Sequence, residues 1–338
     1  VAGIVFLWAG VWAGSAGAQD ALNPKIEAAA SNYKFAGARY GVSILDLETG
    51  RSLADIRASE PFIPASNMKL LTSGAALIVL GKDFEFKTEL VMSGTRLVIR
   101  GAGDPALGDP FVLEHSPDKM TVDGLVGALA TAVGKAGVTS VSEVIVDDRI
   151  FDREYTHPSW PKDQLDRWYC AEVSGLNFHT NVLSVFPAPG GERRPPVYTL
   201  EPTSPWLEIE NKARSVGGSK NSVWLSRERG ANRFTMNGEV AIPTRVPVEI
   251  TMHDLPTFFG QLIATSLPAA GVAVGGVPAL TSDKARLNSA QQSEAIKAVR
   301  LAQPGEALDG RTVAVVTTPI EDLLDRCNGD SQNLYAER

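Results

Sequence analysis

Pro64-Ala65-Ser66-Asn67-Met68-Lys69 leads directly into an apolar, Ala- and Leu-rich run from Leu70 to Leu80. This stretch predicts a buried helix that begins near Ser66. Residues three positions apart share one face of a helix, so Lys69 can reach Ser66. A serine needs a neighbouring base to become a nucleophile, and a lysine kept from water can act as that base. The free N–H groups at the helix start would also favour a developing anion.

The spacing Ser-x-x-Lys occurs three times, and its context distinguishes the copies. Ser31 and Lys34 lie near the end of a short polar helix, and Ser116-Pro117-Asp118-Lys119 reads as a polar turn. Only Ser66 opens a segment that is expected to be buried. On this stretch alone, a second interpretation stays open, in which Ser66 caps the helix and Lys69 is an exposed lysine of its first turn.

Composition limits the class of protein. The chain has 338 residues, of which 44% are hydrophobic and 21% charged, which suits a soluble protein of two or three domains. The net charge of −7 argues against nucleic acid as a partner. Four scattered histidines show no metal-ligand spacing, and Cys170 and Cys327 form no CxxC pattern, so a structural zinc or redox motif is not indicated. A disulfide between the cysteines and a pair of buried thiols both stay open.

Residues 1–18 carry no charge and end in Ser15-Ala16-Gly17-Ala18, which suits signal-peptide cleavage after Ala18. We therefore predict export to the periplasm. A retained membrane anchor is the alternative, and the short, Gly- and Ala-containing run disfavours it. The missing initial Met and positive n-region suggest that the sequence starts within the gene's first codons.

Periodicity and turn residues predict the order of the other elements. Asn23-Pro24 resembles a helix start, and a hairpin of 40–46 with 51–56 should precede the Ser66 helix. The later elements are a hairpin (87–92 and 97–100), helices (121–136, 254–270 and from 320 to about 326), strands (141–146 and 313–317) and a β-rich stretch (197–248).

Ser331-Gln332-Asn333 forms a second polar constellation, on a turn between two helices. The hydroxyl can relay a proton, and the carboxamide can both donate to and accept from a peptide backbone. The pattern Ser-x-Asn is common by chance and recurs at Ser219-Lys220-Asn221. By itself, a serine in this position is more often the N-cap of the following helix than a catalytic residue.

Together, Ser-x-x-Lys and Ser-x-Asn resemble the first two motifs of the serine penicillin-recognising enzymes. The chain is more specifically similar to the D-Ala-D-Ala carboxypeptidase/endopeptidase family of class C low-molecular-mass penicillin-binding proteins (peptidase family S13), in which a large insertion separates the two motifs. The resemblance extends from about Ala21 to Arg338. Within the insertion it includes the stretches 101–105 (Gly-Ala-Gly-Asp-Pro), 144–151 (Val-Ile-Val-Asp-Asp-Arg-Ile-Phe), 169–177 (Tyr-Cys-Ala-Glu-Val-Ser-Gly-Leu-Asn) and 181–185 (Asn-Val-Leu-Ser-Val).

The resemblance implies an α+β multidomain fold. A penicillin-binding-protein/β-lactamase-like transpeptidase domain, with helices on an antiparallel sheet, would be interrupted by a large inserted α/β plus β-rich region. The implied ranges are a signal peptide (1–18), the first part of the transpeptidase-like domain (19–86), the inserted domains (87–285, with an α/β module at roughly 87–165 nested in a β-rich module) and the truncated second part (286–338).

The resemblance also implies the chemistry. Ser66 would attack the penultimate D-Ala of peptidoglycan stem peptides, with a neutral Lys69 as general base, Ser331 as proton relay and Asn333 as a substrate contact. Asp147 could meet an ammonium of the stem peptide, although a solvated strand-end carboxylate is an equally simple interpretation. β-Lactams should acylate Ser66 as inhibitors, and no cofactor is implied. Neither the oligomeric state nor the balance of carboxypeptidase and endopeptidase action follows.

The family's third motif, Lys-Thr-Gly, is absent, and we interpret the chain as C-terminally truncated, so that activity is expected of the full-length product. A catalytically inactive cell-wall-binding protein on the same fold is the alternative function. An esterase or β-lactamase is a third possibility, which the large insertion disfavours.

Overall fold

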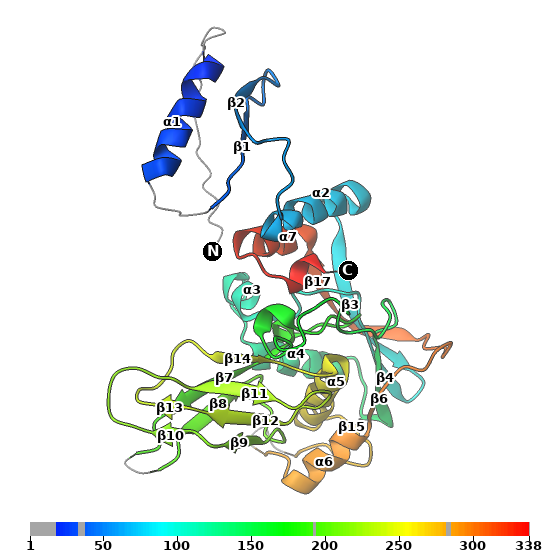
Figure 1. Cartoon of the computed structure of the whole chain (residues 1–338). Coiled ribbons are helices and arrows are strands. Elements are labelled where there is room, and N and C mark those ends of the chain that lie inside the picture. The colour runs from blue at the N-terminus through cyan, green and yellow to red at the C-terminus, as the bar shows by residue number, and fades with distance from the viewer. Residues whose placement is uncertain (1–17, 33–37, 192–193, 282–284, 338) are drawn as a thin grey trace. The chain divides into compact units, whose positions relative to one another are not determined.

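A computed structural model describes residues 18–32, 38–191, 194–281 and 285–337 (Figure 1). The chain divides into two compact units, Val1–Asn67 and Met68–Arg338. The predicted signal peptide, 1–18, lies outside the described residues except for Ala18. In the part of the chain that is described, no helix is both long and apolar enough to cross a membrane.

The first unit combines a helix with a hairpin. Helix α1 (Ala18–Asn32) is followed by the antiparallel strands β1 (Val42–Leu45) and β2 (Ser52–Ile56), and the unit ends in the 3₁₀ turn η1 (Ala65–Asn67). The predicted helix start at Asn23-Pro24 is wrong, because α1 begins earlier and contains Pro24. The Asn23 side chain serves another purpose: it bonds to both backbone groups of Asp55, at 3.2 and 3.1 Å, and joins the helix to β2.

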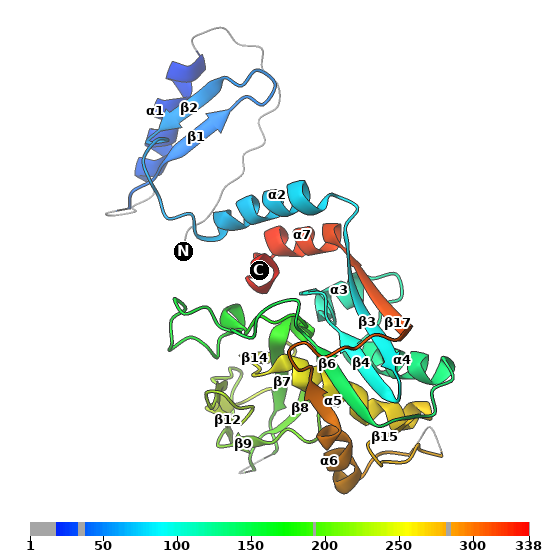
Figure 2. The same ribbon diagram turned by 90° about the vertical axis from the view of Figure 1, so that its right-hand side faces the viewer.

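The second unit contains a mixed five-stranded sheet in the order β16-β6-β4-β3-β17 (Figure 2). The hairpin β3 (Glu85–Ser93) and β4 (Arg96–Arg100) agrees with the prediction, and β6 (Glu143–Asp147) runs parallel to β4. Helix α3 (Pro110–His115), helix α4 (Val122–Lys135) and the short β5 (Ser140–Val141) lie between β4 and β6 in the chain.

The alternation of side chains gives this sheet two buried faces. Leu97 and Ile99 of β4 pack with helices α4 and α5 (Leu255–Ser266) in the main core. Val98, between them in sequence, points to the other face and packs with Ala302 and Leu308. Both faces of the sheet are therefore buried. The segment that follows β16 (Val299–Leu301) covers the face to which Val98 points.

The region after β6 is rich in short strands, as predicted for 197–248. Its sheets have the orders β14-β7-β8, β11-β12-β9 and β10-β13. The elements are η2 (Trp168–Cys170), η3 (His179–Asn181), β7 (Val182–Ala188), β8 (Val197–Glu201), β9 (Ile209–Asn211), β10 (Arg214–Ser215), β11 (Trp224–Arg227), β12 (Phe234–Asn237), β13 (Glu239–Val240) and β14 (Val248–Thr251).

After α5 the chain returns to the five-stranded sheet. It passes through η4 (Leu267–Ala270), β15 (Ala273–Val274), α6 (Ser289–Lys297), β16 and β17 (Arg311–Pro319) to α7 (Ile320–Gly329) and the 3₁₀ turn η5 (Leu334–Ala336). Strand β17 pairs antiparallel with β3 from Arg311 to Pro319, and β16 pairs parallel with β6. The sheet thus draws strands from both sides of the predicted boundary at 285/286. The domain boundaries themselves stay a prediction.

Helix α2 (Met68–Leu80) opens the second unit, beside α7 (Figure 2). Its two buried residues are polar, Lys69 and Ser73. Most of its large apolar side chains are exposed, up to 86% for Ile78. The prediction that this run is buried is therefore wrong for the described residues, because α2 contacts α7 and η5 with its polar side.

Candidate active site

Lys69 is the buried polar group around which the site is built. It lies in the first turn of α2 and its residue is only 7% exposed. Its Nζ donates a hydrogen bond of 2.8 Å to Oδ1 of Asn333. The alternative of an exposed first-turn lysine is therefore wrong: the residue is buried, and its amine is directed at Asn333 of the predicted second motif.

The next turn of α2 continues the same polar contact. Ser73 lies four residues after Lys69, and residues at this spacing share one helix face. Its hydroxyl is hydrogen-bonded to the carboxamide of Asn328 in α7, 3.0 Å from Nδ2. Two successive turns of α2 are thus hydrogen-bonded to the C-terminal part of the chain. Lys69 binds the Ser331–Asn333 turn, and Ser73 binds α7 just before it.

Asn333 is held from two sides. While Oδ1 accepts from Lys69, Nδ2 donates to the backbone carbonyl of Tyr169 at 2.9 Å. A carboxamide carries two N–H donors, so one donor is left for another acceptor. Ser331, in the same turn, is half-buried and adopts a left-handed backbone with φ of +58°, which is uncommon for a residue with a side chain.

Ser66 lies in η1, which closes the first unit, and α2 follows directly in the chain. The backbone of this turn is closed by a hydrogen bond of 3.0 Å from Asn67 N–H to the Pro64 carbonyl. The predicted helical start after Pro64 is therefore confirmed, as a 3₁₀ turn that precedes the α-helix. The role of Ser66 as nucleophile stays a prediction.

The other copies of the two motifs have different surroundings. The Ser116 hydroxyl donates to the Leu113 carbonyl at the end of α3, and Lys34 lies outside the described residues. Asn221 accepts backbone N–H groups of Ala241 and Ile242 at 2.7 and 3.1 Å, as an ordinary loop bridge. Among the described copies, only the Ser-x-x-Lys copy at 66–69 and the Ser-x-Asn copy at 331–333 are joined to each other, through Lys69 and Asn333. The choice of Ser66 as nucleophile stays a prediction.

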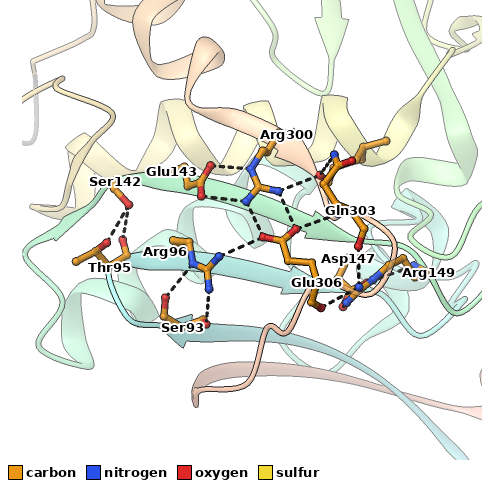
Figure 3. Close-up of polar contacts among 11 residues, drawn as sticks. Ser93, Thr95, Arg96, Ser142, Glu143, Asp147, Arg149, Arg300, Gln303 and Glu306 are labelled. Atoms are coloured by element: carbon orange, nitrogen blue, oxygen red, sulfur yellow. Dashed lines mark hydrogen bonds and ion pairs between the residues drawn. The ribbon is translucent and has the colours of Figure 1, made fainter.

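Asp147 is engaged elsewhere. Its two carboxylate oxygens accept Nε and Nη2 of Arg149 at 2.7 and 2.9 Å, in the polar network of Figure 3. The Arg149 guanidinium lowers the pKa of this carboxyl. Arg149 in turn donates to the carbonyls of Gln303 and Glu306. The contacts of Asp147 are thus with Arg149 rather than with Lys69 or Asn333, and its role in binding substrate stays a prediction.

The cysteines are both free and buried, and burial raises the pKa of each thiol. Of the two possibilities that the sequence left open, the structure has the pair of thiols. Among the described residues, no group of three or more His, Cys, Asp or Glu side chains could hold a metal ion.

Sequence reasoning missed the Tyr169 carbonyl. Tyr169 belongs to a stretch that resembles the family, but a backbone acceptor carries no side-chain signal. It also missed Asp109 and Tyr335, which lie buried beside the Ser331–Asn333 turn and are joined by a hydrogen bond of 2.6 Å. Asp109-Pro110 does carry a local signal, that of a helix N-cap.

Residues 22–338 match the model of the D-Ala-D-Ala carboxypeptidase 3 (S13) family. The chain belongs to this family. It is 30% identical over 276 residues to a D-alanyl-D-alanine carboxypeptidase of Actinomadura sp. (strain R39), which covers 76% of this chain and 50% of that protein. A carboxypeptidase of Mycobacterium tuberculosis is 26% identical over 282 residues, or 80% of this chain and 57% of that protein. This S13 chain therefore spans about half the length of the curated relatives that it matches.

Solved structures confirm the predicted fold of this S13 chain. Penicillin-binding protein 4 of Haemophilus influenzae superposes with a TM-score of 0.59 at 17% identity, over 87% of this chain and 60% of that chain. The same protein complexed with a β-lactam gives a TM-score of 0.56 at 16% identity, over 91% of this chain and 61% of that one. The multidomain α+β fold of a penicillin-binding protein is thus shown.

Proposed function

We propose that the protein is a serine-type D-Ala-D-Ala carboxypeptidase or endopeptidase that acts on peptidoglycan stem peptides. Family membership over residues 22–338 supports the reaction class. The single observation that carries the proposal is the buried Lys69, whose Nζ lies 2.8 Å from Asn333. Two groups from the two predicted motifs, far apart in sequence, thus meet in a place shielded from water.

In the proposed mechanism, Oγ of Ser66 attacks the carbonyl of the penultimate D-Ala, and Lys69 takes the hydroxyl proton. Ser331 relays this proton: its hydroxyl gives a proton to the leaving amine and takes one from Lys69, which becomes neutral again. The C–N bond breaks, D-Ala leaves as the free amine, and the rest of the peptide remains as an ester on Ser66. Water then hydrolyses this ester and regenerates the serine.

The other groups orient the substrate and stabilise charge. Asn333 has an N–H donor left over from its bond to Tyr169, and this donor would hold the peptide amide of the substrate. The backbone N–H of Ser66 would stabilise the oxyanion, an interaction typically worth about 3 kcal/mol. Asp147 would bind the ammonium of the stem peptide only if that ammonium displaced Arg149 from the carboxylate. The mechanism uses no metal or organic cofactor.

A relative complexed with a β-lactam supports the further proposal that β-lactams acylate Ser66. Such a ligand presents the same kind of reactive carbonyl to the serine. The chemistry of the substrate also supports a location in the periplasm, where peptidoglycan stem peptides are accessible.

The decisive experiment is peptide mapping by mass spectrometry after incubating the product of the complete gene with a penicillin. The proposal expects one covalent adduct, on Ser66, that disappears in Ser66→Ala. An adduct on Ser31 or Ser116, or none on folded protein, would contradict it.

Turnover separates the proposed activity from its alternatives. Release of D-Ala from a D-Ala-D-Ala peptide supports a peptidase. Faster hydrolysis of a simple ester would favour an esterase, and co-sedimentation with peptidoglycan without release of D-Ala would favour a wall-binding protein.

A further inference from the structure

Asp109 is a buried carboxylate that lies beside the Ser331–Asn333 turn and outside the proposed catalytic set. Its residue is 1% exposed. One oxygen caps α3, because Oδ1 accepts the N–H of Phe111 at 2.9 Å. The other oxygen, Oδ2, accepts the Tyr335 hydroxyl at 2.6 Å and Nε of Arg326 at 3.0 Å. Asp109 therefore joins α3 to both α7 and η5.

These two partners flank the turn on either side in sequence. Tyr335 follows Asn333 by two residues. Arg326 reaches the other flank, because its Nη1 bonds to Oδ2 of Asp330 at 2.5 Å, and Asp330 directly precedes Ser331. Asp109 is thus bound by one residue before the Ser331–Asn333 turn, Arg326, and by one residue after it, Tyr335. The turn lies between these two points of attachment.

The surroundings make this attachment rigid. Tyr335 belongs to an apolar cluster with Leu323, Cys327 and Leu334, which Ala106 and Val173 complete. Burial raises the pKa of Tyr335, so its hydroxyl stays a donor throughout the physiological range of pH. In such a dry site a charge-assisted hydrogen bond is strong, and a carboxylate left without its partners is costly.

The turn needs such support. Ser331 has a positive φ, which costs energy for a residue with a side chain and persists only when the surrounding structure imposes it. Asn333 keeps its bonds to Lys69 and to Tyr169 only if the turn holds its place to within a few tenths of an ångström.

We propose that Asp109 is a positioning residue, which fixes the Ser331–Asn333 turn through Tyr335 and Arg326 so that Asn333 meets Lys69. The inference rests on the proposed function in one respect, namely that the turn takes part in acylation. It assigns to a residue of the predicted insertion an influence on Lys69 that is transmitted through Tyr335, Arg326 and the turn.

The test is Tyr335→Phe, which removes only the hydroxyl donor to Asp109. A matched control exists in the chain: the Tyr155 hydroxyl donates at 3.2 Å to Asp148, a fully buried carboxylate that also binds an arginine, Arg153, at 2.7 Å. Both tyrosine variants lose a hydroxyl bond to a buried carboxylate, so both should lower the unfolding temperature, Tyr335→Phe by more because its bond is shorter and more buried.

Only Tyr335→Phe should slow the chemistry. We expect its acylation by a fluorescent penicillin to be about tenfold slower at saturating penicillin, a loss of about 1.4 kcal/mol, while the apparent dissociation constant changes little. Tyr155→Phe should acylate at the parent rate. Equal rates in the two variants would overturn the proposal.

Hydrogen exchange supplies a readout that does not depend on acylation. In Tyr335→Phe, amides of residues 330–336 should exchange faster than in the parent, whereas Tyr155→Phe should leave them unchanged. If the parent is never acylated, the proposed function fails, yet faster exchange in Tyr335→Phe alone would still support the attachment. Unchanged exchange would refute it.

A double-mutant cycle connects the effect to Asp109. Asp109→Asn keeps the shape of the side chain but weakens both bonds of Oδ2. If Asp109 acts through Tyr335, the loss of acylation rate in the double variant should be clearly smaller than the product of the two single losses. Independent, multiplicative losses would show that Asp109 does not act through Tyr335.

Discussion

Lys69 and Asn333 are 264 positions apart in the chain, and the Nζ of the first lies 2.8 Å from Oδ1 of the second. This bond joins the lysine of the predicted Ser-x-x-Lys motif to the asparagine of the predicted Ser-x-Asn motif in an S13 family member. Lys69 is a buried residue whose amine donates to a carboxamide of the other motif, so the pairing is one of tertiary structure.

Lys69→Met should abolish most of the acylation while leaving the fold intact, because methionine replaces the buried stem without the amine. General-base catalysis is typically worth about 10²–10⁴-fold, so we expect acylation of Ser66 to slow by about 10³-fold. Stopped-flow measurement with a fluorescent penicillin checks this. Lys82→Met is the control, since that side chain is 82% exposed and should leave the rate unchanged. A Lys69→Met protein that folds and acylates at the parent rate would exclude Lys69 as the base.

Asn333→Ala should lower the acylation rate by about 10²-fold, because Lys69 loses its acceptor and the substrate loses an orienting donor. Asn221→Ala removes the second Ser-x-Asn carboxamide, which bridges two backbone N–H groups in a distant loop. It should cost about 0.5–1.5 kcal/mol of stability without changing the rate per folded molecule. Comparable rate losses in both variants would mean that the effect is only structural.

Glu306 should make stability depend on acid pH. Arg300 is the main cause that lowers the pKa of Glu306 from 4.5 to about 2 (Figure 3). A carboxyl whose pKa is lower in the folded state stabilises that state above the unfolded value. This contribution is therefore complete above about pH 4.5 and is lost as the pH falls from there toward 2.

The measurement is urea unfolding of the parent and of Glu306→Gln between neutral pH and pH about 3. We expect the difference between the urea midpoints of the two proteins to be constant near neutral pH. It should decrease below about pH 4.5, the pKa of Glu306 in the unfolded state. Glu294→Gln, which breaks an exposed pair with Lys297 at 3.3 Å, should show little gap at any pH. A gap that widens in acid would contradict the assigned sign.

Cys170 and Cys327 should react slowly with a thiol reagent in the native protein and completely after unfolding. Both are buried, and burial raises the pKa of each, so that little thiolate is present or accessible. Counting thiols by absorbance with and without guanidinium tests this. Two thiols that appear only on unfolding agree with the structure, whereas none under non-reducing conditions would indicate a disulfide.

Local residue patterns determined much of this protein. The hairpins, the helices after Thr121 and Asp254, and the β-rich stretch follow from periodicity and turn residues, which act over short distances. The two motifs, the large insertion between them and the family-like stretches within it together indicated the family, since each is a short string read without knowledge of the fold. The choice of Ser66 over the other Ser-x-x-Lys copies also came from neighbouring residues.

The tertiary structure alone decided which groups meet. An apolar run after Lys69 predicted burial of the run, yet the polar side of α2 is the buried one, because Lys69 and Ser73 find hydrogen-bond partners beside α7. The sequence did not indicate that Arg149 pairs with Asp147, and the role of this carboxylate in binding substrate stays a prediction. The Tyr169 carbonyl and the Asp109–Tyr335 bond are long-range pairings. Such pairings depend on how the chain closes on itself, and no local pattern encodes them.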